Sequence, residues 1–213
     1  MQLILVRHAE NDWVGDRLAG WTPGVHLNDK GRQQAGDLGA RLAHLPIAAI
    51  YSSPLERAVE TAQAIAAHHN LKTQILEGVG ETRYGEWTGA SLKELAKTEL
   101  WPVVQVYPSG ARFPGGESLR ETQARAVKAI DALYDAHPKE TDVVVLVSHA
   151  DVIKAAVAHY AGLHLDLFQR LIISPASMSV IRFGKFAPRI VCLNDTGDVP
   201  QPPTGQEDTE TSK

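Results

Sequence analysis

The sequence is poor in cysteine and has no long apolar run. Its only cysteine is Cys192, so no disulfide can form within the chain and nothing calls for an oxidising compartment. The longest apolar stretches, residues 3–6 and 143–147, fall far short of the roughly 20 residues that a membrane-spanning helix needs. A signal peptide is not expected, because Arg7 and His8 follow directly on a short apolar run. These absences predict a cytoplasmic protein without a membrane partner.

Charge of one sign is not in large excess either. Lysine and arginine total 21 against 25 aspartates and glutamates, a formal net charge of -4 with histidine neutral. Nucleic-acid binding relies on a basic excess or stripe that displaces counterions, and no basic run occurs here, so we expect no nucleic-acid partner. Hydrophobic residues make up 44% of the 213 residues, enough to build the core of a protein that folds by itself.

Strand-like and helix-like segments alternate along most of the chain. Apolar segments of strand length occur at residues 2–6, 48–51, 73–76, 142–147, 178–183 and 189–193. Apolar residues recur with helical spacing in segments 29–45, 55–66 and 119–133. This alternation predicts an α/β fold whose largely parallel sheet carries functional groups on loops beyond the carboxyl ends of its strands.

Two segments depart from this alternation. Residues 88–117 contain an expected helix at 91–100 followed by a stretch with Pro and Gly, and we interpret them as a lid or rim insertion. Residues 195–213 have almost no apolar anchor and are predicted to form a disordered tail. No repeat or linker divides residues 1–194, so we expect one domain there.

Histidines follow two of the predicted strands. The first strand runs into Arg7 and His8, and the strand at 142–147 runs into His149. A histidine in such a place is by itself more often structural than functional. If the two strands are neighbours in a parallel sheet, however, both imidazoles reach one cleft. The sequence therefore indicates a site at this edge.

An arginine is expected at the same edge. The strand at 48–51 leads into Ser-Ser-Pro-Leu-Glu-Arg-Ala-Val-Glu-Thr-Ala at 52–62, where Pro54 suits the first turn of a helix that also contains Arg57. Alone, Arg57 would be interpreted as a solvated surface charge. Together with Arg7 and the two histidines, it makes a donor-rich pocket whose planar guanidinium groups suit phosphate oxygens.

These motifs together resemble the histidine phosphatase superfamily, the phosphoglycerate mutase-like proteins. The similarity rests on the Arg-His pair, the run at 52–62 and the late Ser-His pair, and it extends in order and spacing over residues 1–194. The resemblance implies a three-layer α/β sandwich with a mostly parallel central sheet flanked by helices. It also implies a phosphohistidine mechanism that needs no metal or other cofactor.

The resemblance also assigns roles to individual residues. His8 matches the nucleophile, and Arg7 and Arg57 match the phosphate clamp. His149 matches the second histidine of the pocket, and Glu81 stands where the pattern Glu-x-x-x-Gly-x-Trp-x-Gly places the proton donor. Substrate contacts are expected from Asn11, Ala19, Gly20, Arg83, Tyr84 and Ala150.

The sequence also departs from the family pattern. Three and six residues after the nucleophile, where the mutases and many phosphatases carry Ser or Thr and then Asn, this chain has Asn11 and Val14. One usual polar phosphate contact is therefore missing, and Asn11 or a backbone amide is expected to replace it. Glu86 remains an alternative to Glu81 as the proton donor. The run at 18–35 is similar to a branch of broad-specificity phosphatases and probable phosphomutases, a name that does not decide the reaction.

Hydrolysis is the reaction that the pattern favours. The family's mutases carry Arg directly after the acid and a longer insertion, whereas Thr82 follows Glu81 here and the insertion is short. We predict a metal-independent phosphomonoester hydrolase that acts on a small phosphorylated metabolite, as a monomer or homodimer. A phosphoglycerate mutase-like phosphoryl transferase and a non-catalytic phosphoryl-binding protein stay open. A metallohydrolase is disfavoured, because neither His-Glu-x-x-His nor Cys-x-x-Cys occurs.

Overall fold

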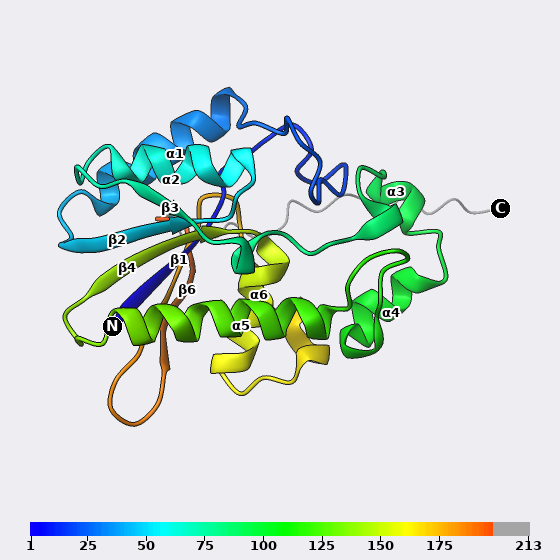
Figure 1. Ribbon diagram of the computed structural model, residues 1–213. Coiled ribbons are helices and arrows are strands. Elements are labelled where there is room, and N and C mark those ends of the chain that lie inside the picture. The colour runs from blue at the N-terminus through cyan, green and yellow to red at the C-terminus, as the bar shows by residue number, and fades with distance from the viewer. Residues whose placement is uncertain (198–213) are drawn as a thin grey trace, which may run out of the picture.

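A mixed sheet of 6 strands forms the centre of the molecule, in the order β3-β2-β4-β1-β5-β6 (Figure 1). The structure is a computed structural model and describes residues 1–197. β1 pairs in parallel with β4, and β2 pairs in parallel with β3 and β4. β5 pairs antiparallel with both of its neighbours, β1 and β6. The strands are β1 (Gln2–Arg7), β2 (Ile47–Ser52), β3 (Thr73–Ile75), β4 (Val143–Ser148), β5 (Met178–Arg182) and β6 (Arg189–Asp195).

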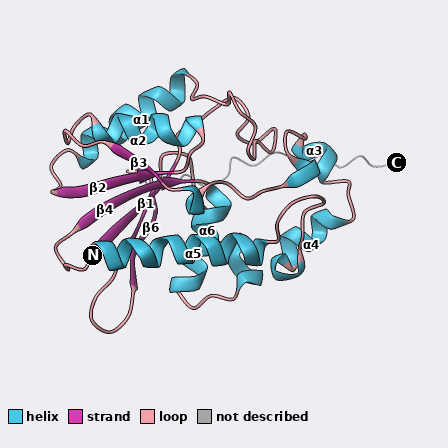
Figure 2. Ribbon diagram, viewed as in Figure 1, coloured by secondary structure: helices cyan, strands magenta, loops and turns pink. Residues whose placement is uncertain are grey.

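Helices cover both faces of the sheet (Figure 2), which confirms the expected layered α/β fold. Side chains alternate along β1, so that Ile4 and Val6 pack among residues of α1 and α2, while Leu3 and Leu5 pack among residues of α5 and α6. The helices are α1 (Asp29–Leu42), α2 (Glu56–Ala66), α3 (Leu92–Leu95), α4 (Leu100–Val106), α5 (Leu119–Ala136) and α6 (Ala150–Tyr160), with short 3-10 turns η1 (Glu77–Val79), η2 (Gly85–Trp87), η3 (Pro108–Gly110) and η4 (Leu165–Arg170).

Two helix predictions need correction. The expected helix at 91–100 is split into α3 and α4, because the Thr98 hydroxyl donates to the Leu95 carbonyl (2.7 Å) and so caps the end of α3. Pro54 is not in the first turn of α2, since the N-cap is Leu55. Helix α6 went unpredicted because it is buried on more than one side and shows little apolar periodicity.

The strand register brings three loops to one edge of the sheet. Arg7 of β1 pairs with Ser148 of β4, and Ser52 of β2 pairs with Val147. The ladder continues for one more step on β1, where the His8 amide donates to the Ser148 carbonyl (2.9 Å). The carboxyl ends of β1, β2 and β4 are therefore level, and the residues that follow them share one place.

Residues 88–117 lie beside this edge of the sheet. Their helices α3 and α4 lie beyond the carboxyl end of the sheet (Figure 1). The segment is tied to the loop after β1 through bonds from the Leu18 amide to the Ala90 carbonyl (3.0 Å) and from the Gly89 amide to the Leu18 carbonyl (2.7 Å). This segment is thus packed against the loop that follows the first strand.

The last described residues belong to the sheet. β6 extends to Asp195, which the sequence analysis placed in the tail, and its carboxylate pairs with Arg41 of α1 (3.1 Å). Residues 198–213 of the predicted tail lie outside the described residues. Within residues 1–197, no helix has the length and apolar character needed to cross a membrane.

Candidate active site

A cleft of about 160 Å³ opens at the carboxyl ends of the central strands. Of the residues that the sequence assigned to the site, the lining contains Arg7, His8, Asn11, Ala19, Arg57, Glu81, Tyr84 and Ala150. His149 lies beneath it, fully buried, with its ring centroid 5.2 Å from that of His8. The two histidines thus meet as the strand argument required, because β1 and β4 are neighbours.

The His8 imidazole is buried and held in one tautomer. Its Nδ1 lies 2.8 Å from the Ala9 carbonyl, and because a carbonyl only accepts hydrogen bonds, Nδ1 carries the proton. The Nε2 atom therefore keeps its lone pair and accepts a hydrogen bond from Arg57 Nε at 3.3 Å. Burial, and then the charges of Arg57 and Arg7, hold the pKa of His8 well below its ordinary value. A neutral imidazole faces the cleft.

The loop that carries His8 is anchored to α2. The Ala9 amide donates to Thr61 Oγ1 (3.0 Å), and the Thr61 hydroxyl donates in turn to the Arg57 carbonyl (2.7 Å). Helix α1 braces the loop from outside, since a Cβ on Gly31 would lie 1.9 Å from the Glu10 carbonyl oxygen. Only glycine allows the helix to approach so closely.

Arg57 is a cleft residue and not a solvated surface charge. It is 1% exposed, and its Nη2 donates to the Gly20 carbonyl (2.8 Å) and to Nδ1 of His149 (3.3 Å). Nη1 of Arg57 and Nε of Arg7 are buried and have no hydrogen-bond partner among the described residues. Buried donors in proteins are nearly always paired, so these two nitrogens mark a place where an anion is favoured.

His149 is fixed by its neighbours as well. Because Arg57 only donates, Nδ1 of His149 accepts, and its proton is on Nε2, 2.7 Å from Ser53 Oγ. Burial and the charges of Arg57, His8 and Arg7 hold the pKa of His149 well below its ordinary value. The carboxyl Oε2 of Glu81 lies 3.7 Å from Nδ1 of His149, so this carboxyl stands beside the second histidine of the site.

The chain matches the model of the histidine phosphatase superfamily (branch 1) over residues 3–196. Phosphoserine phosphatase 1 of Hydrogenobacter thermophilus is 32% identical over 92% of this chain and 93% of its own. Phosphoglycerate mutase-like protein 4 of Arabidopsis thaliana is 34% identical over 72% of this chain and 68% of its own. A phosphoserine phosphatase mutant from Entamoeba histolytica, solved with phosphoserine, superposes with a TM-score of 0.82 at 26% identity, over 92% of this chain and 97% of that one.

The chain belongs to the histidine phosphatase superfamily. In this member of the superfamily, the structure distinguishes the two carboxylates that competed in the sequence. Glu81 is 9% exposed and lines the cleft, whereas Glu86 is exposed and lies outside the lining. Burial, and then the charge of Asp151, raise the pKa of Glu81 to about 7. This carboxyl can therefore hold or release a proton near neutral pH.

Two of the substrate contacts expected from the sequence lie outside the cleft lining. Gly20 reaches the site only through its carbonyl, which accepts from Arg57. The guanidinium of the exposed Arg83 lies over the Trp21 ring, 4.1 Å from its centroid. Cation–π stacking of this kind keeps the guanidinium on the indole ring.

Two polar residues of the cleft were not predicted from the sequence. Asp151 and Arg17 both line it, and the Tyr84 hydroxyl donates to Asp151 Oδ2 (2.9 Å). A signal for Asp151 was present, since it stands two residues after His149 in the first turn of α6. Arg17 gave no signal, because its loop has no regular period that would aim a side chain.

Proposed function

We propose that this protein is a phosphatase that hydrolyses small phosphomonoesters through a phosphohistidine intermediate on His8. The observation that carries the proposal is a neutral, buried imidazole whose Nε2 faces Arg57, in a cleft where Nη1 of Arg57 and Nε of Arg7 have no hydrogen-bond partner within residues 1–197. A phosphate dianion needs such donors, and its phosphorus needs such a nucleophile. The proposed site takes no metal, nucleic acid or membrane partner, and a cytoplasmic monomer or homodimer stays our prediction.

The first half-reaction forms the phosphoenzyme. The Nε2 lone pair of His8 attacks phosphorus in line, the nitrogen–phosphorus bond forms, and the bond to the ester oxygen breaks. Glu81 gives its proton to that oxygen, so that an alcohol and not an alkoxide departs. Arg7 and Arg57 neutralise the transferred group, and at an effective dielectric near 20 a charge pair about 4 Å apart interacts by about 4 kcal/mol.

The second half-reaction uses the same residues in reverse. Glu81, now ionised, removes a proton from water as the water oxygen attacks phosphorus, and the bond to Nε2 breaks with its electron pair returning to the imidazole. The products are inorganic phosphate and the starting enzyme. A mutase would instead return the phosphoryl group to a second hydroxyl, and the Thr82 that follows Glu81 departs from the mutase pattern.

Phosphoserine heads the candidate substrates. A relative with that activity in its name aligns over 92% of this chain, and a similar structure was solved with phosphoserine. In this chain Arg17 and Asp151 line the cleft beyond the arginine clamp. A guanidinium suits the carboxylate of an amino acid and a carboxylate suits its ammonium group, so the lining supports a small zwitterionic leaving group.

A substrate panel tests the proposal directly. Purified protein is assayed for phosphate release from phosphoserine, sugar phosphates, phosphoglycerates, nucleotides and p-nitrophenyl phosphate, with and without EDTA. In parallel, 3-phosphoglycerate and a bisphosphoglycerate are supplied together to detect phosphoryl transfer. We expect hydrolysis that EDTA does not change. Transfer that exceeds hydrolysis favours the mutase, loss of turnover in EDTA contradicts the metal-free mechanism, and no turnover of any ester favours a binding protein.

The pH dependence tests the role of Glu81. The acid must be protonated, and the pKa of Glu81 is raised to about 7. As pH rises through that value the acid form is lost, so kcat/KM for an alkyl phosphate should fall about tenfold per pH unit on the alkaline side. His8 adds no opposing change there, because its pKa is held well below its ordinary value. A profile that stays flat from acid to pH 9 would contradict this role.

A further inference from the structure

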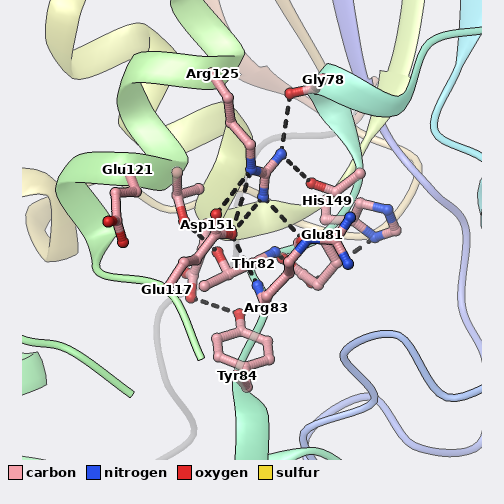
Figure 3. Close-up of polar contacts among 12 residues, drawn as sticks. Gly78, Glu81, Thr82, Arg83, Tyr84, Glu117, Glu121, Arg125, His149 and Asp151 are labelled. Atoms are coloured by element: carbon pink, nitrogen blue, oxygen red, sulfur yellow. Dashed lines mark hydrogen bonds and ion pairs between the residues drawn. The ribbon is translucent and has the colours of Figure 1, made fainter. Parts of the chain in front are cut away.

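The segment that leads to Glu81 is held by side chains at every step. Four successive carbonyls accept hydrogen bonds: Gly78 and Gly80 from Arg125 Nη1 (2.9 and 2.7 Å), Val79 from Ser148 Oγ (2.7 Å), and Glu81 from Arg125 Nη2 (2.9 Å). Figure 3 shows the Arg125 guanidinium reaching from helix α5 across to this segment. One guanidinium thus fixes three of the four carbonyls.

A carboxylate holds the guanidinium from the opposite side. Glu117 Oε1 lies 2.7 Å from Arg125 Nη2, and Oε2 lies 3.1 Å from Arg125 Nε. The same Oε1 accepts hydrogen bonds from the Arg83 amide (2.8 Å) and the Thr122 hydroxyl (2.9 Å). The ion pair therefore grips the backbone on both sides of Glu81, at residues 78–81 through Arg125 and at Arg83 through Glu117.

The pair is placed to resist movement. Its side chains are 23% and 12% exposed, so water competes less for these bonds than at the surface. Burial favours the neutral form of Glu117, yet the hydrogen bonds from Arg125 and the Arg83 amide hold its pKa below the ordinary value. Arg125 belongs to the 18-residue helix α5, whose first turn carries a capping box of Ser118 and Glu121. The guanidinium of the ion pair is thus carried by a long, capped helix.

Neither member of the pair lines the cleft. We propose that the Arg125–Glu117 ion pair positions Glu81 for proton transfer to the leaving oxygen, so that Arg125 is a positioning residue for the reaction. The inference rests on the proposed function, in which Glu81 is the acid. Proton transfer needs the carboxyl within hydrogen-bond reach of that oxygen, and a misplacement of about 1 Å can cost about 10²-fold in rate.

Leaving-group dependence separates this role from general damage. Phosphoserine has an alkoxide leaving group that needs a proton, whereas p-nitrophenolate departs without one. A misplaced acid therefore slows the first substrate and spares the second, while a loosened fold slows both. The measured quantity is the ratio of kcat/KM for phosphoserine, or the best alkyl ester of the panel, to kcat/KM for p-nitrophenyl phosphate.

Four variants form the experiment: Arg125→Gln, Glu117→Gln, Glu81→Gln as the benchmark and Arg41→Gln as the matched control. Arg41 of α1 also makes an ion pair, with Asp195 of β6 (3.1 Å), but it has no hydrogen bond to residues 78–81 within the described part of the chain. We expect the ratio to fall by about 10²-fold or more in Glu81→Gln and by about tenfold in Arg125→Gln. Glu117→Gln should shift the ratio in the same direction by less, and Arg41→Gln should leave it unchanged.

The outcomes distinguish this inference from the proposed function. If Glu81→Gln lowers the ratio but Arg125→Gln and Glu117→Gln slow both substrates equally, the positioning role is wrong and the acid assignment stands. If Glu81→Gln itself leaves the ratio unchanged, both fall. Circular dichroism checks the fold, and should Arg125→Gln not fold, Glu117→Gln decides alone, because it keeps the shape of the side chain and removes its charge.

Discussion

Replacement of His8 by alanine is expected to lower kcat/KM by about 10⁴-fold or more, the scale on which loss of a nucleophile acts in covalent enzymes. The reason is geometric as well as chemical. Nε2 of His8 carries the buried lone pair and lies 3.3 Å from Arg57 Nε. His149 cannot replace it, because it is fully buried and outside the cleft lining, with its Nε2 held 2.7 Å from Ser53 Oγ.

The measurement follows both turnover and the covalent intermediate. A phosphate-labelled substrate is mixed with enzyme, the reaction is stopped in alkali, and protein-bound label is counted. Wild-type protein should carry label and His8→Ala should carry none. His44→Ala serves as the control, since His44 is exposed and lies outside the cleft. Label or full turnover in His8→Ala would identify another nucleophile.

Exchange of Arg57 for lysine is expected to lower kcat/KM by about 10²–10³-fold, the effect of removing one fixed donor from a transition-state site. Lysine keeps the charge but offers a point charge in place of a planar fork. The Arg57 fork touches His8, His149 and the Gly20 carbonyl at once and still leaves Nη1 without a partner among residues 1–197. An ammonium group cannot reproduce these directions.

The control for Arg57→Lys is the same exchange at a surface ion pair. Arg41 pairs with Asp195 (3.1 Å), and neither residue lines the cleft. Arg41→Lys should therefore leave kcat/KM unchanged. Thermal unfolding of both variants shows whether the buried exchange also weakens the fold. An Arg57→Lys protein that is folded and as active as the wild type would mean that a positive charge alone suffices. That result would contradict the role of the planar guanidinium in holding the phosphate.

Much of the fold and the core of the site followed from local sequence signals. The apolar strands were predictable because each is short and bounded by turn residues, and β1 and β4 are the two that are directly followed by a histidine. The step from two histidines to one cleft depended on their being neighbours, which the pairing of Arg7 with Ser148 supplies. The assignment of Arg57 to the site followed only from considering it together with Arg7 and the two histidines, since an arginine in a first helical turn is usually solvated.

The remainder depends on contacts between distant parts of the chain. Arg125 lies in the middle of an amphipathic helix, where a basic residue is typical of a solvated face, yet it bonds to Gly78 and Gly80. Asp151 acquires its effect on the pKa of Glu81 only because α6 begins beside that loop. Hydrophobic periodicity does not predict such contacts, since they depend on how the helices and the sheet pack against each other.

The bond between His8 Nδ1 and the Ala9 carbonyl (2.8 Å) also determines which isomer of the proposed intermediate can exist. With that nitrogen protonated and turned toward the main chain, phosphorus can join only the tele nitrogen, Nε2, and never the pros nitrogen. Phosphoramidates are labile in acid, so this modification should escape acidic peptide work-up. Reagents that recognise the tele isomer alone, used at alkaline pH, are therefore the appropriate means to find it in cell extracts.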